Sequence, residues 1–125
     1  LLTTDEIAYN SSFGDDKISL SKSMFNNNNK LVGLRIKGDS MIDDSVEDGD
    51  IIIIDCSNNS SYKPKQGDMV VARVDEDSAT LKRIYKNGNK IELRPSNNKY
   101  SSIITNNNNV IIEGKVVGLI RSFLN

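Results

Sequence analysis

The sequence predicts a mostly β protein with a compact antiparallel fold. Short apolar or alternating stretches recur along the chain with turn residues between them. No window of ten or more residues carries the 3.6-residue apolar repeat of an amphipathic helix. The length of 125 residues suits one domain, and a hydrophobic content of 37% is adequate for a small β core.

The expected elements follow in chain order. Residues 1–29 are polar and weakly patterned, with one short candidate strand at residues 18–20. From residue 31 the alternation sharpens, and we expect one helical turn around residues 42–46. The expected strands are residues 31–37, 51–54, 69–74, 79–85, 90–94 and 110–123.

Turn residues set the limits of these strands. Gly38 ends the first strong strand, and Asp48-Gly49-Asp50 forms a tight turn in which Gly49 is free to take positive φ. That turn leads directly into residues 51–54, four isoleucines that suit a strand buried on both faces. Asn87-Gly88 is typical of a hairpin turn.

Composition excludes several classes of function. The net charge is −1 and the pI about 5.4, so this chain has no basic field to draw it to DNA or to an anionic membrane. The longest aliphatic run, residues 51–54, is far shorter than the ~20 residues of a membrane helix. A single cysteine and no signal-peptide pattern favour the reducing cytoplasm. The start at Leu1 without methionine indicates a fragment or a processed product.

The chain contains no histidine, which removes any Ser-His-Asp site. A serine nucleophile still needs a base, and a lysine can serve if burial removes its charge. Ser40 follows Gly38-Asp39 in a turn, where successive backbone N–H groups could hold an oxyanion. Lys82 lies in a predicted strand 42 residues later. Ser40 and Lys82 are therefore candidates for a Ser-Lys dyad.

Each member of this pair also has a plainer interpretation. Gly, Asp and Ser are ordinary turn formers, and most lysines are solvated and charged. Thr80 and Lys82 share one face of their strand and Leu81 the other, and both faces are mixed, so the pattern leaves open which face is buried. With a pKa near 10.4, about one free lysine in 2,500 is neutral at pH 7, and full burial lowers that pKa by ~3–5 units.

Two other groups are given structural roles. Cys56 ends an apolar strand and is interpreted as a buried small residue. The acidic residues of the 43–50 segment lack the alternation and closing glutamate of a calcium loop, and we expect a solvated turn. No metal site and no cofactor are predicted. The acidic residues are Asp43, Asp44, Glu47, Asp48 and Asp50.

Six segments together resemble the C-terminal domain of the LexA-type self-cleaving repressors, which include phage repressors of the cI kind and the related UmuD proteins. The Lys-Gly-Asp-Ser-Met segment around Ser40 and the Thr-Leu-Lys-Arg segment around Lys82 are two of them. The matches occur in family order over roughly residues 31–122. They are residues 34–41, 48–55, 67–73, 80–84, 91–97 and 113–120.

The resemblance implies a signal-peptidase-like β fold in which Ser40 attacks a peptide bond and Lys82 is the general base. It implies that the backbone amides of Asp39 and Ser40 hold the oxyanion. It further implies that the protein cuts its own linker, at an Ala-Gly or Cys-Gly bond, when a RecA filament forms on single-stranded DNA. Neither dipeptide occurs here, so we expect the cleavage site and any DNA-binding domain to lie before Leu1 or to have been removed.

We accordingly expect residues 1–30 to be an N-terminal arm and residues 31–125 the autopeptidase and dimerisation domain. The segment between Ser40 and Lys82 is long for LexA itself and closer to the phage repressors. An alternative function is a UmuD-like accessory subunit of a translesion DNA polymerase. A purely structural dimerisation module is another. A membrane signal peptidase is disfavoured because the sequence has no apolar anchor.

Residues 110–120 carry more apolar side chains than an edge strand should leave in water. A second copy pairing there would give a homodimer, the arrangement that the resemblance also implies. The alternative is a strand interior to the monomer sheet, which needs no partner. The homodimer is expected not to bind duplex DNA by itself.

Overall fold

The protein is described by a computed structural model covering residues 4–10, 16–21, 30–56, 63–75 and 79–123. The strands form one mostly antiparallel nine-stranded sheet in the order β2-β1-β3-β4-β9-β5-β6-β7-β8, which confirms the predicted fold class. Among the strands that the structure describes, only β1 and β3 pair in parallel. The strands are β1 (Thr4–Asn10), β2 (Asp16–Ser21), β3 (Leu31–Arg35), β4 (Ile51–Asp55), β5 (Asp68–Val74), β6 (Thr80–Asn87), β7 (Lys90–Arg94), β8 (Ile103–Asn106) and β9 (Val110–Ile120).

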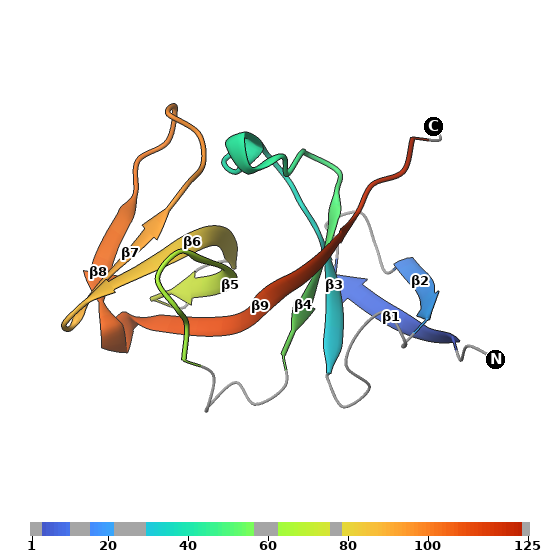
Figure 1. Cartoon of the computed structure of the whole chain (residues 1–125), viewed down its shortest axis with the longest axis horizontal. Helices are drawn as coiled ribbons and strands as arrows, with labels where there is room; N and C mark the ends of the chain where they lie inside the picture. The colour runs from blue at the N-terminus through green and yellow to red at the C-terminus, as the bar shows by residue number, and fades with distance from the viewer. Residues whose placement is uncertain (1–3, 11–15, 22–29, 57–62, 76–78, 124–125) are drawn as a thin grey trace.

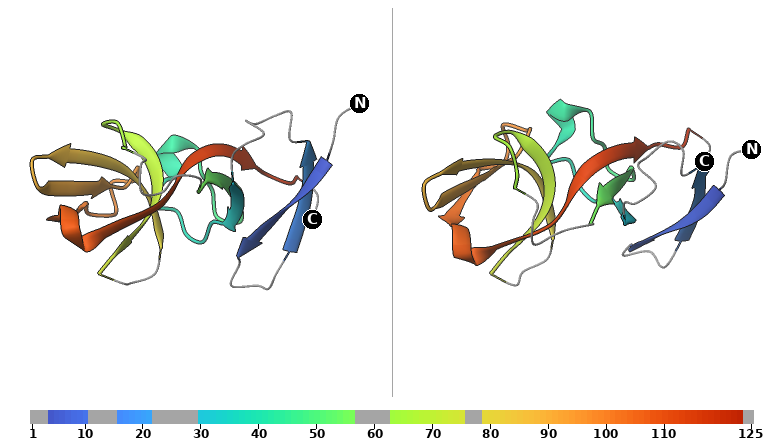
Figure 2. Two further views of the ribbon diagram at one scale, coloured as in Figure 1. Left: turned by 90° about the horizontal axis from the view of Figure 1, so that it is seen from below. Right: turned by 60° about the horizontal axis from the view of Figure 1, so that its bottom comes forward.

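The sheet has two halves joined by β9 (Figure 1). The first part of β9 pairs with β5, and the last part pairs with β4. Lys115 is where the two pairings meet, because it lies opposite both Val70 and Asp55. The β1–β2 and β7–β8 pairs lie at opposite ends of an elongated molecule (Figure 2). Residues 110–120 are not the lone edge strand that was predicted: β9 lies between β4 and β5 in the strand order, and each half of it pairs with one of these two strands.

The strand predictions agree with the structure to within a few residues from β3 to β7. The expected helical turn is a short 3-10 helix, η2 (Ile42–Asp44), and a second one, η3 (Asn107–Asn109), precedes β9. Gly49 has φ +89° in the predicted turn. β1 and β8 were not predicted, and β9 ends three residues before the predicted limit of 123.

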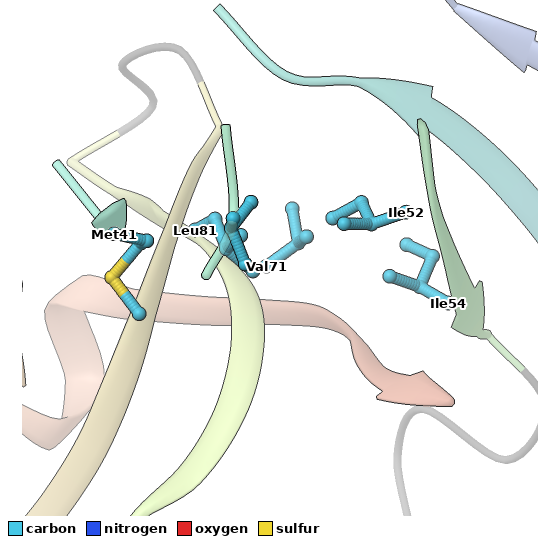
Figure 3. Close-up of a cluster of buried hydrophobic side chains, with 6 residues drawn as sticks. Met41, Ile52, Ile54, Val71 and Leu81 are labelled. Carbon is cyan, nitrogen blue, oxygen red and sulfur yellow. The ribbon is translucent and has the colours of Figure 1, made fainter. Parts of the chain in front are cut away.

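Two hydrophobic clusters lie on opposite faces of β5. Val70 and Ala72 point into a cluster at the β6–β7 end, together with Ile84, Ile91 and Leu93. Val71 points into the other cluster, the cluster beneath the Ser40 turn, which includes Met41 next to Ser40 in sequence, and Figure 3 shows Met41, Val71 and Leu81 of this cluster. That cluster contains Met41, Val46, Ile52, Ile54, Val71 and Leu81. Because Met41 follows Ser40 directly and is 2% exposed, packing fixes the backbone at the candidate nucleophile.

Candidate active site

Ser40 lies in the turn that connects β3 to η2. Gly38 has φ +97°, a conformation that L side chains rarely adopt, so glycine permits the turn. The Gly38 N–H donates to Oδ1 of Asp48 at 2.7 Å, and the Ile36 N–H donates to the Asp50 carbonyl at 2.7 Å. These bonds close the 37–49 loop at its base and hold the turn above the sheet.

Lys82 comes from the middle of β6 and reaches the same turn. Its Nζ lies 3.2 Å from Ser40 Oγ, 2.7 Å from Thr80 Oγ1 and 3.0 Å from the Leu81 carbonyl oxygen. The structure thus brings the two sequence-predicted residues into direct hydrogen-bond contact. Thr80 lies on the same strand face as Lys82, and its hydroxyl accepts a second hydrogen bond from the amine.

The surroundings of Lys82 lower its pKa. The residue is 7% exposed, and burial disfavours the charged ammonium, which moves the pKa below its ordinary value. Leu81 and Ile84, on opposite strand faces, are both buried. Alternation could not identify the buried face of this strand because, in the described structure, both of its faces are buried at this position.

The amides expected to hold an oxyanion lie at the same turn. The N–H groups of Asp39 and Ser40 donate no hydrogen bond to any other residue in the described part of the chain. On either side, Gly38 donates to Asp48 and Ile42 donates to the Asp39 carbonyl at 3.1 Å, whereas the Met41 N–H, like those of Asp39 and Ser40, donates to no residue in the described part of the chain. The turn therefore leaves adjacent donors, those of Asp39 and Ser40 among them, available for a ligand.

A cavity of about 240 Å³ opens beside Ser40. Its walls combine aliphatic side chains from β3, β4, β5 and β6 with the polar residues Arg35, Lys37 and Thr80. Such a pocket suits an apolar side chain next to a bond held over Ser40. The lining residues include Leu34, Ile36, Met41, Ile52, Val71 and Leu81.

Several residues that hold this turn had no predicted role. Arg83 donates to both carboxylate oxygens of Asp44, at 2.8 and 2.9 Å, and Ser96 Oγ also donates to Asp44. Asn97 and Tyr100 donate to Asp39. Because Asp39 is a carboxylate, its bond raises the pKa of the Tyr100 hydroxyl. In the sequence, only the family resemblance over residues 91–97 pointed to Ser96 and Asn97, and that resemblance gave no role for either side chain.

The acidic segment is the expected solvated turn at Asp43, Glu47 and Asp48, which are exposed, but not at Asp50. Asp50 is 2% exposed and accepts two bonds from Arg121, at 2.8 and 2.7 Å. The Arg121 guanidinium, together with the Glu47 N–H, holds the pKa of this carboxyl below its ordinary value. No group of three metal-ligating side chains occurs among the residues that the structure describes.

Cys56 is half-buried at the end of β4 and packs against the cluster beneath the Ser40 turn. Burial raises the pKa of its thiol, which disfavours the nucleophilic thiolate. Cys56 thus packs against the core as expected, but it is half-buried where a buried residue was expected. None of the described helices is long and apolar enough to cross a membrane.

Comparison with known proteins identifies the class to which this fold and site correspond. The Peptidase S24-like family matches residues 3–117, and the chain belongs to that family. A LexA repressor of Cereibacter sphaeroides (strain ATCC 17029 / ATH 2.4.9) is 36% identical over 110 residues, which cover 88% of this chain. The same match covers 47% of the repressor, so the chain spans about half the length of that relative. The resemblance to LexA-type domains is confirmed.

Proposed function

We propose that this chain is a Ser-Lys autopeptidase domain, in which Ser40 is the nucleophile and Lys82 its general base. The observation that carries the proposal is the 3.2 Å contact between Lys82 Nζ and Ser40 Oγ at a lysine that is 7% exposed. A base must reach the proton it removes, and it must be neutral to accept it. The contact meets the first requirement, and burial favours the second because it lowers the pKa of Lys82.

The partners of Lys82 suit a lysine that changes its protonation state without moving. An ammonium has three N–H donors, and the three contacting oxygens accept them. A neutral amine has two N–H donors and one lone pair. Since the Leu81 carbonyl can only accept, the amine keeps its bonds to Leu81 and Thr80 and turns its lone pair toward Ser40. Loss of one proton thus converts the resting site into the active one.

The reaction proceeds by acyl transfer. Ser40 Oγ attacks the carbonyl carbon of the scissile peptide as its proton passes to Lys82 Nζ, and the amides of Asp39 and Ser40 stabilise the oxyanion. Collapse of this intermediate breaks the C–N bond, and Lys82 returns the proton to the leaving amine. Water, activated by Lys82, then hydrolyses the acyl-serine. The aliphatic part of the cavity beside Ser40 holds a side chain next to the scissile bond.

We propose that the parent protein is a LexA- or cI-like transcriptional repressor, cytoplasmic and homodimeric. The repressor name of the 36% identical relative supports this. Residues 31–125 are its autopeptidase and dimerisation domain, and residues 1–30 are the arm that leads into it. The substrate is a bond of the parent polypeptide, a RecA filament stimulates its cleavage, and DNA is bound through a separate N-terminal domain.

The test is covalent labelling of the 125-residue chain with a fluorophosphonate, followed by mass spectrometry from pH 6 to 10. We expect one label, on Ser40, at a rate that rises with pH as Lys82 loses its proton. Ser40→Ala abolishes labelling, and Lys82→Ala removes the rise. Ser101→Ala and Lys86→Ala are matched controls, since both residues are exposed and Lys86 lies on the same strand as Lys82. An unlabelled Ser40, or a rate independent of pH, contradicts the proposal.

A further inference from the structure

The peptide unit between Asp39 and Ser40 is held in place by hydrogen bonds to its carbonyl oxygen. The Asp39 oxygen accepts the Ile42 N–H at 3.1 Å and the side-chain amide Nδ2 of Asn97 at 2.9 Å. A trans peptide unit is planar, so its N–H points opposite to its C=O. The donors that fix the Asp39 carbonyl therefore also fix the direction of the Ser40 N–H.

Asn97 belongs to the loop between β7 and β8, residues 95–102, which meets the Ser40 turn from outside the sheet. Its Oδ1 accepts the Lys99 N–H at 3.0 Å, which orients the amide so that Nδ2 faces Asp39. The same loop donates the Ser96 N–H to the Ser40 carbonyl at 2.8 Å and the Tyr100 hydroxyl to Asp39 Oδ1 at 2.6 Å. The peptide units on both sides of the Ser40 Cα are thus bound by one loop.

We propose that Asn97 is a positioning residue for the oxyanion hole. Its side-chain amide holds the Asp39–Ser40 peptide plane so that the Ser40 N–H faces the place where the oxyanion forms. This inference rests on the proposed peptidase function. The side chain of Asn97 bonds to Asp39 and Lys99, and among the described residues its contacts do not include Lys82. Asn97 should therefore affect stabilisation of the oxyanion and leave the base untouched.

Two substitutions distinguish the effect of the Asn97 side-chain donor from the effect of disturbing its loop. Asn97→Asp keeps the side-chain shape and the acceptor for Lys99, and removes the donor to Asp39. Asn97→Ala removes both bonds. Asn98→Ala is the matched control, because Asn98 is exposed in the same loop. Each variant of the 125-residue chain is labelled with a fluorophosphonate, whose phosphoryl oxygen occupies the oxyanion site, and its thermal melting is recorded.

We expect both Asn97 variants to lower the plateau rate of Ser40 labelling about tenfold or more. The loss is smaller than the ~100- to 1,000-fold effect of deleting an oxyanion donor, because the Ser40 N–H remains present. The pH midpoint of Asn97→Ala stays at the wild-type value, since Lys82 keeps its partners. Asn98→Ala matches the wild type in rate and midpoint.

Two results would overturn the inference: a folded Asn97→Asp that labels at the wild-type plateau rate, or a loss in Asn97→Ala that a shifted pH midpoint fully explains. If Asn97→Ala does not fold, Asn97→Asp decides the question. Wild-type chain whose Ser40 is never labelled refutes the peptidase function, and this inference with it. Normal labelling of the wild type and of both Asn97 variants refutes the positioning role alone.

Discussion

At the scale of single residues, Lys82 links the chemistry of the site to the stability of the fold. Its pKa is lowered in the folded protein because burial disfavours the ammonium, whereas in the unfolded chain it returns to about 10.4. Between these two pKa values the unfolded state holds a proton that the folded state lacks. The unfolding free energy contributed by Lys82 therefore rises with pH across that window.

We predict that the wild-type chain gains stability relative to Lys82→Met as the pH rises from neutral toward 10. Urea unfolding of both chains at a series of pH values measures the difference and cancels the titration of the other lysines. Lys86→Met, at an exposed position on the same strand, is the matched control. If the difference in unfolding free energy between the wild type and Lys82→Met is constant over this range, burial in the folded state does not shift the titration of Lys82.

The sequence identified Ser40 and Lys82 through the absence of histidine and the family resemblance. It could not supply the burial of Lys82, because β6 alternates mixed residues on two faces and both faces are covered in the fold. Nor could it supply the role of Asn97, which lies 58 residues from the carbonyl that it binds. A contact of this kind depends on where two loops meet, and no local pattern encodes it.

At the scale of elements, β9 is the strand that joins the two halves of the sheet. Gly114 is buried just before the residue where the strand changes partner from β5 to β4. A Cβ at this position would lie 2.7 Å from the Asp55 carbonyl oxygen, which is backbone and cannot turn aside. Glycine is needed here because two strands approach closely.

We predict that Gly114→Ala destabilises the protein by about 1–3 kcal/mol, the usual range for an overpacked site. Chemical denaturation monitored by circular dichroism measures the change. Lys115→Ala at the next position is the control, with an expected effect below about 1 kcal/mol because its ion pair with Asp68 is long and partly exposed. Equal effects of the two substitutions would show that the close approach does not limit stability.

Turn residues and alternation predicted most of these elements, since Gly38, Gly49 and Gly88 take the positive φ that their turns require. The same logic failed for β9. Its apolar residues were attributed to an edge, but both partners come from within the chain, Ile51–Asp55 and Asp68–Val74. Period-2 alternation indicates which face of a strand is buried. It does not indicate which strands pair with it. β8 was missed because four residues are too few to show a period.

At the scale of the whole molecule, the end of β9 presents an apolar surface. Val117 and Leu119 are 40% and 41% exposed, and Phe123 beyond the strand is 86% exposed. In this half of the strand the described sheet pairs one edge only, through β4. Exposed apolar side chains beside an open edge are what a second copy would cover by a two-fold contact.

We predict that the chain is a homodimer at tens of micromolar and that Leu119→Asp converts it to a monomer, as measured by sedimentation equilibrium. Ile104→Asp is the control, because Ile104 is 69% exposed on β8, at the other end of the sheet. With a net charge of −1, neither form should retain duplex DNA at physiological salt. A monomeric wild type would contradict the dimer, and DNA retention would contradict a separate DNA-binding domain.

The position of β9 also has a consequence for the order of events during synthesis. Ser40 belongs to the half that contains β3 and β4, Lys82 to the half that contains β5 and β6, and the strand that joins these halves is made after both. A ribosome releases chains from the N-terminus, so nucleophile and base both emerge before the strand that joins their halves. On the proposed function, a growing polypeptide cannot cut itself. The peptidase comes into being only when its own translation has passed residue 120.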